Sequence, residues 1–138
     1  MIRLVHGIHG LLLSFPIALF SAALAADIAY LNTAEIQWTN FASWLIAGAL
    51  VFGGAVALLA LIIWIASLRS RPGPLSLVYL LIVVVMWIVG LLNALQHSRD
   101  AWSSVGTAGL LMSIVTTVLA LLAGAILFSR PARREIVR

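Results

Sequence analysis

The chain has 138 residues, of which 64% are hydrophobic and 9% are charged, with a formal net charge of +4 and no cysteine. A soluble domain carries roughly 25% charged residues, so this composition excludes an ordinary water-soluble globule and indicates that lipid surrounds much of the chain. The lack of cysteine excludes disulfides, thiolate metal sites and cysteine nucleophiles. Every basic residue is an arginine and most flank apolar runs, which favours lipid headgroups over nucleic acid as their partner.

Four long apolar runs dominate the sequence. A helix that crosses a bilayer needs about 20 predominantly apolar residues, and four runs have that length: Leu11–Leu31, Phe41–Leu68, Leu75–Leu95 and Val105–Phe128. None shows strand alternation, and open sheet edges do not occur in lipid. The sequence therefore predicts an all-α membrane protein, a four-helix bundle in a single domain over residues 1–138. The expected helices cover approximately 8–31, 40–68, 75–97 and 104–129.

The first run also resembles a cleaved signal peptide, because Arg3 gives it a positive start and residues 23–25 (Ala-Leu-Ala) fit a cleavage site. Its apolar stretch is longer than a signal peptide needs, so we expect a retained helix. Pro16 lies inside this run and should free the carbonyl of Leu12, with Ser14 near enough to compensate. A modest kink is the expected result, and a functional hinge is the alternative.

The arginines predict the orientation. With four crossings both termini share one side, which then holds seven of the arginines, while the other side holds only Arg99. By the positive-inside rule both termini should be cytoplasmic. The 69–74 turn is then cytoplasmic, and the 32–40 and 96–104 loops face outward. The expected membrane-interface residues are two outer tryptophans and five inner arginines: Trp38, Trp102, Arg69, Arg71, Arg130, Arg133 and Arg134.

Polar residues gather near the outer ends of two runs. Asp27 is the only acid inside an apolar run, and a carboxylate there is costly unless it is paired or reaches water. Asn93 and His97 are four residues apart and so share a helix face. With Arg99 and Asp100 they are expected to form an outer polar cluster. This cluster either satisfies its own members and ties helices to a loop, or forms a small-molecule, quinone or proton site.

The histidines and Asn93 are the candidate ligands. His6 and His9 share a helix face at metal-binding spacing, but no third ligand is near, so no metal site is predicted. His9, His97 and Asn93 are the candidate cofactor-binding residues. Because a helix of 20 residues is about 30 Å long, His9 and His97 lie too far apart to share one haem. No cofactor is predicted, although a quinone or a lipid remains possible.

Small residues mark two packing faces. The second run carries Ala49 with three glycines, and the fourth carries glycines and hydroxyl residues that bond back to the backbone; these are Gly48, Gly53, Gly54, Gly106, Gly109, Ser113, Thr116, Thr117 and Gly124. Such residues let helices approach closely and predict interior faces. No phosphate loop is indicated, because none of these glycines follows a strand.

Two stretches, HGLLLSFPIAL at residues 9–19 and NALQHSRDAWSSVGTAG at residues 93–109, together resemble a known family, the DUF2231 membrane proteins. Residues 9–19, HGLLLSFPIAL, are similar to the family's H-P-x-x-V-x-F-P-I-x-L opening, with Gly10 in place of the usual proline, and Asp27 falls where that opening commonly places an acid. Residues 93–109, NALQHSRDAWSSVGTAG, are similar to its stretch before the last helix. The resemblance implies a bacterial four-helix fold without an established general activity. This chain departs from the family pattern at three places. Of the family's Asp-Trp pattern in the second helix only the tryptophan, Trp64, is present; the third run lacks the family's histidine, and the last run lacks its Gly-Trp-Leu-Gly-Gly block. These departures imply that a polar site shared by the family is eroded here at the cytoplasmic end.

These observations favour a non-catalytic accessory or structural subunit of a larger assembly in the bacterial inner membrane, with a respiratory or redox complex as its setting. Its expected partners are the lipid bilayer and other membrane subunits, and no nucleic acid. An enzyme is not expected, since no nucleophile, base and acid can converge. The alternatives are a quinone- or haem-b-associated electron-transfer protein and a small transporter or proton conductor based on Asp27.

Overall fold

The computed structural model describes residues 2–70, 73–99 and 105–129. All regular structure in these ranges is helical: α1 (Ile2–Thr33), α2 (Ile36–Ser67), the 3-10 turn η1 (Leu68–Ser70), α3 (Pro74–His97) and α5 (Thr107–Ser129). The four α-helices are each long and apolar enough to cross a membrane. The predicted all-α, four-helix membrane fold is therefore confirmed.

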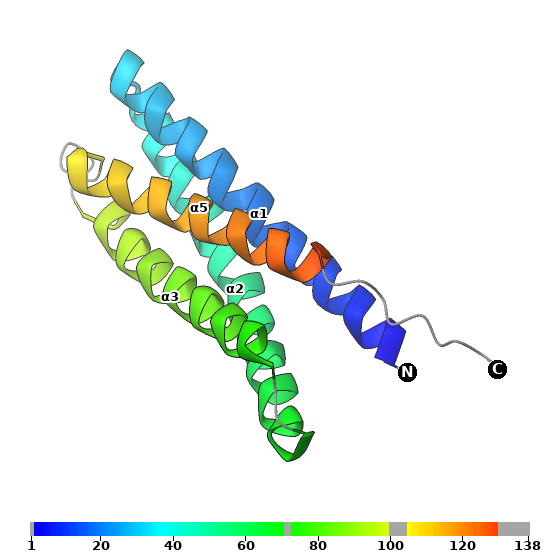
Figure 1. Ribbon diagram of the computed structural model, residues 1–138. Helices are drawn as coiled ribbons and strands as arrows, with labels where there is room; N and C mark the ends of the chain where they lie inside the picture. Colours follow the sequence, from blue (N-terminus) through cyan, green and yellow to red (C-terminus); the bar gives the residue numbers. More distant parts are fainter. Residues whose placement is uncertain (1, 71–72, 100–104, 130–138) are drawn as a thin grey trace.

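The helices form a ring in which each packs against two neighbours (Figure 1). Helix α1 contacts α2 and α5, and α3 contacts the same two helices from the opposite corner. Successive helices run in opposite directions, so α1 and α3 run parallel across the diagonal of the bundle. The start of α1 and the end of α5 lie at the same end, where a Cβ built on Gly10 would be 3.1 Å from the ring of Phe128.

The helix ends differ from the expected ones at two places. Helix α1 begins at Ile2 rather than at residue 8. The predicted 32–40 loop is mostly helical, and only Ala34 and Glu35 separate α1 from α2. Nothing between residues 36 and 40 breaks a helix, so α2 starts at once. The reversal places Ala34 at φ 55°, a left-handed conformation that a residue with a Cβ adopts at a cost.

The first two helices are longer than the last two. Helices α1 and α2 have 32 residues each, against 24 in α3 and 23 in α5. At 1.5 Å per residue the difference of eight or nine residues is about 12 Å. The α1–α2 hairpin therefore extends beyond the start of α5 at the end where α1 turns into α2 (Figure 1).

Prolines occupy different positions in two helices. Pro74 occupies the first turn of α3 after the N-cap Gly73, where its missing N–H costs nothing. Pro16 is buried within α1, yet the helix continues through it. The hydroxyl of Ser14 donates to the carbonyl of Leu11 at 2.6 Å, so it bonds the carbonyl next to the one that the sequence suggested.

Helices α1 and α3 present the same inward register. Each of the seven buried residues of α3 lies 70 positions after a buried residue of α1. The buried residues of α3 are Tyr79, Leu80, Val83, Met86, Gly90, Asn93 and His97, and their counterparts are His9, Gly10, Leu13, Pro16, Phe20, Ala23 and Asp27. Contacts follow this register, because a Cβ on Gly90 would lie only 2.9 Å from Cζ of Phe20. Helices α1 and α3 thus face each other across the bundle with the same inward register.

The neighbouring helices are tied by specific contacts. The indole of Trp87 on α3 lies over Gly53 and Gly54 of α2, and its Nε1 donates to the carbonyl of Leu50 at 3.0 Å. On the other side, the hydroxyl of Thr117 on α5 lies 3.1 Å from the carbonyl of Phe20 on α1. Small residues therefore lie where two helices approach, as in other membrane bundles.

Candidate functional site

Three helices bring polar side chains together in the half of the bundle nearest the α1–α2 turn. Helix α1 provides Asp27, α3 provides Asn93 and His97 from one face, and α5 provides Ser113. All four residues are buried, with Asp27, Asn93 and Ser113 fully inaccessible. They form one continuous network, which we call the Asp27 network.

The carboxylate of Asp27 lies at the centre of the network. Its Oδ1 is 2.9 Å from Nε2 of His97, and its Oδ2 accepts a 2.5 Å hydrogen bond from the hydroxyl of Ser113. The same hydroxyl oxygen accepts from Nδ2 of Asn93 at 2.9 Å. A buried carboxylate is stable only when it is paired and hydrogen-bonded, and Asp27 has both kinds of partner.

The histidine ring is fixed at both nitrogens. Nδ1 of His97 lies 3.0 Å from the backbone carbonyl of Asn93, one turn earlier in α3. A carbonyl oxygen only accepts, so Nδ1 carries a proton. That carbonyl and the Asp27 carboxylate fix the orientation of the ring.

One acceptor of the network stays unused. Oδ1 of Asn93 is buried and has no hydrogen-bond partner within the described residues. Two hydroxyls continue the polar track deeper along α5, because Thr116 and Thr117 both lie within hydrogen-bonding distance of the carbonyl of Ser113. Below them the core is apolar.

A second polar pair closes the opposite end of the bundle. Nε2 of His9 on α1 lies 2.6 Å from the hydroxyl of Tyr79 on α3, and both residues are buried. Their rings are tilted, with centroids 5.5 Å apart. In each of the two pairs, His9–Tyr79 and Asp27–His97, the two residues are 70 positions apart and join α1 to α3. The end of the bundle whose polar site the family resemblance described as eroded therefore contains a histidine–tyrosine pair.

The structure unites some of the predicted site residues and separates others. Asp27 contacts His97 directly and is linked to Asn93 through Ser113. The side chain of Arg99 is exposed, and no bond from it to the network is described. Asp100 lies outside the described residues. The sequence did not identify Ser113 or Tyr79 as partners. Ser113 was recognised only as part of the small-residue face of α5, and Tyr79 is marked only by being a hydroxyl-bearing side chain within an apolar run.

The other predicted residues lie apart from these two pairs. His6 is exposed while His9 is buried, and the described residues contain no group of three or more His, Asp or Glu that could hold a metal. Trp38 is half-buried against the core, and Arg69 is exposed after α2. The remaining interface residues lie outside the described residues: Trp102, Arg71, Arg130, Arg133 and Arg134.

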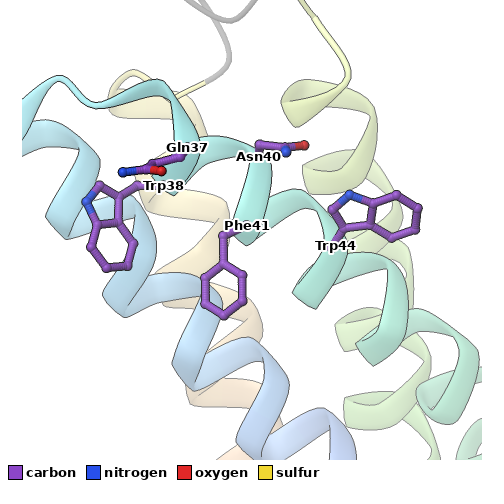
Figure 2. A pocket seen from close by; sticks show the side chains of 5 residues that line it. All are labelled: Gln37, Trp38, Asn40, Phe41 and Trp44. Atoms are coloured by element: carbon purple, nitrogen blue, oxygen red, sulfur yellow. The ribbon is translucent and has the colours of Figure 1, made fainter.

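A shallow hollow of about 540 Å³ lies on the outside of α2 near its start. Figure 2 shows three aromatic rings spreading below two side-chain amides. All five lining residues belong to the first turns of α2: Gln37, Trp38, Asn40, Phe41 and Trp44. This combination suits the interface between hydrocarbon and headgroups, where aromatic rings are enriched.

The fold and the two pairs define a class: a four-helix integral membrane protein whose intramembrane polar groups bond across the bundle. The family model described as "Predicted membrane protein (DUF2231)" matches residues 5–126. The chain therefore belongs to the DUF2231 family, as the sequence indicated. Neither the search of curated proteins nor that of solved structures found a match.

Proposed function

We propose that this protein is a non-catalytic accessory or structural subunit of a larger assembly in the bacterial inner membrane. The proposal rests on how the intramembrane polar side chains are used. Asp27 bonds to His97 and His9 bonds to Tyr79, in both cases across the bundle. The groups that a transporter or an enzyme would present to a substrate are thereby occupied in holding α1 against α3.

The space between the two pairs argues against conduction. His9 and Asp27 are 18 positions apart on α1, which corresponds to about 27 Å along the helix. Leu13, Phe20 and Val83 lie between them and are at most 1% exposed. Such a buried apolar segment supports a closed body over a proton path.

The same separation argues against a haem within one chain. Two axial histidines must face each other at one depth. His9 and His97 lie in opposite halves of the bundle, and each is already hydrogen-bonded. Any haem would then require a ligand from another subunit.

The outer helix faces are the surfaces left for a partner. Trp44 and Val51 on α2 are 74% and 72% exposed. In lipid, helices associate by close packing and by hydrogen bonds between helices. A respiratory or redox assembly is the setting suggested by the family resemblance, and it is part of the proposal.

In-membrane crosslinking tests the accessory role. A photoreactive amino acid replaces Trp44 or Val51 in the full chain, expressed in its own membrane, and Ile46, which is fully buried, serves as the matched control. We expect the two exposed positions to crosslink one and the same membrane protein in stoichiometric yield, and Ile46 to give no such product. A monodisperse monomer without a crosslinked partner from either exposed position would contradict the role.

The aromatic hollow of α2 favours a second candidate function, binding of a quinone or a lipid headgroup. Aromatic rings can stack on a quinone ring, and the amides of Gln37 and Asn40 can donate to its carbonyl oxygens. A photoreactive quinone should label the first turns of α2, with loss of labelling in Trp44→Leu. Equal labelling by a photoreactive phospholipid would assign the hollow to lipid, and labelling elsewhere would remove this candidate.

A further inference from the structure

We propose that the Asp27 network is a buried proton-binding site, in which proton uptake by Asp27 reverses the chain of hydrogen bonds that ends at Oδ1 of Asn93. This inference is independent of the accessory role. It rests on the directions of the hydrogen bonds and on the one acceptor that the network leaves unused.

The present direction of the chain follows from its donors. Ser113 has one O–H, which it donates to Oδ2 of Asp27. Its oxygen accepts from Nδ2 of Asn93, so this chain runs from Asn93 through Ser113 to Asp27. Nδ1 of His97 is committed to the Asn93 carbonyl, and a proton on Nε2 then satisfies Oδ1 of Asp27. We take this proton to lie on Nε2 of His97, so that in this state the network holds an imidazolium and a carboxylate and is neutral.

Loss of a proton would leave two acceptors facing each other. If Nε2 were bare, its lone pair would face Oδ1 of Asp27 at 2.9 Å. If Nδ1 were bare, it would face the Asn93 carbonyl at 3.0 Å. Either arrangement is repulsive in a site without water access, since both side chains of the pair are fully inaccessible. The geometry therefore retains the proton on the pair.

A further proton has one binding position in the network. Both nitrogens of His97 already donate, so the proton binds the Asp27 carboxylate at Oδ2, the oxygen that faces Ser113. Oδ2 then donates to the hydroxyl oxygen of Ser113, whose own O–H must find a new acceptor. After half a turn of the side-chain amide, Oδ1 of Asn93 takes the place that Nδ2 holds now. This oxygen is buried and without a partner in the described chain, so it can accept.

Few other charges lie near the site among the residues that the structure describes. Helices α2 and α5 contain no ionisable side chain, and α5 presents the uncharged hydroxyl of Ser113. On α3 the ionisable partner is His97, and on α1 Tyr30 follows Asp27 by one turn. Glu35 and Arg99 are exposed at the same end of the bundle. The proton balance is therefore decided mainly by the pair itself.

Infrared difference spectroscopy of the full chain in lipid nanodiscs tests the proposal. The chain has two aspartates, so an Asp100→Asn variant carrying ¹³C-labelled aspartate reports Asp27 alone. Side-chain ¹³C-asparagine, in a second sample in which Asn32 and Asn40 are replaced by Gln, reports Asn93. Between neutral and acid pH we expect the carbonyl band of a protonated Asp27 to appear together with a shift of the Asn93 amide band.

Two matched hydroxyl variants separate the relay from simple protonation. In Ser113→Ala the Asp27 band should still appear while the Asn93 shift is lost. In Thr117→Ala, one turn deeper on the same helix, both signals should remain as in the parent chain. Circular dichroism checks that each variant keeps its helices. If Asp27 stays ionised throughout the pH range of the folded bundle, or becomes protonated without a response of Asn93 in the parent chain, the proposal is wrong.

Discussion

Removing His97 should destabilise the bundle much more than the loss of one ordinary contact. In His97→Leu the carboxylate of Asp27 stays fully buried and keeps only the bond from Ser113. Breaking a buried ion pair typically costs about 3–5 kcal/mol. Intramembrane hydrogen bonds measured pairwise average only about 0.6 kcal/mol, because the unfolded helices also find partners. Asp27 can in addition become protonated, so we expect a loss of roughly 2–3 kcal/mol in the free energy of unfolding.

The double variant Asp27→Leu, His97→Leu makes the prediction sharper. It removes the carboxylate that the single variant leaves unpaired, and replacing a buried ion pair by apolar side chains is often neutral or stabilising. The cost that remains comes from Ser113 and Asn93, which lose a partner, and amounts to about 1 kcal/mol. The double variant should therefore be more stable than His97→Leu alone.

Unfolding in mixed micelles, followed by circular dichroism and tryptophan fluorescence, measures both costs. Tyr79→Phe is the matched control at the other end of the bundle, because it removes one hydrogen bond to His9 without leaving a charge, and should cost about 0.5–1.5 kcal/mol. If the costs of the two leucine substitutions simply add, or if His97→Leu costs no more than Tyr79→Phe, the reasoning about a buried charged pair is refuted.

Two further predictions concern packing and topology. Gly90→Ala should lower the free energy of unfolding by about 1–3 kcal/mol, because the new Cβ would lie within 3.1 Å of two side chains. Gly7→Ala is the control: Gly7 is also in a helix but faces open space, so this variant should be neutral or slightly stabilising. The same unfolding assay compares the two variants, and equal effects would contradict the packing. Since the chain has no cysteine, single cysteines at Ser98 and Arg69, both exposed, report the orientation. An impermeant thiol reagent added to intact cells should label the first and spare the second, and the opposite result would invert the topology.

The sequence predicts the fold well because its main determinant is local. Four apolar runs of sufficient length specify four helices whatever their partners are. Helix ends were less accurate, because the sequence between residues 32 and 40 is polar enough to look like a loop but contains nothing that breaks a helix. The short connection depends on Ala34 adopting a left-handed conformation, which its residue type does not announce.

The site was predicted only as far as it depends on one helix at a time. Asp27 was conspicuous as the one acid in an apolar run, and Asn93 with His97 share a face through their spacing. Their partners are set by the packing of different helices. Ser113 lies 86 positions from Asp27, and Tyr79 lies 70 positions from His9. No local pattern connects residues so far apart.

The shared register of α1 and α3 explains why the groups that meet across the bundle are unlike. Helices α1 and α3 are parallel, and residues 70 positions apart face each other. If both helices had the same residue at such a pair of positions, two identical side chains would meet. Two large rings would clash, and Phe20 instead meets Gly90. Two acids would repel, and Asp27 instead meets His97. Complementary size and charge at these paired positions allow α1 and α3 to approach each other across the bundle, so substitutions there should be judged in pairs, not singly.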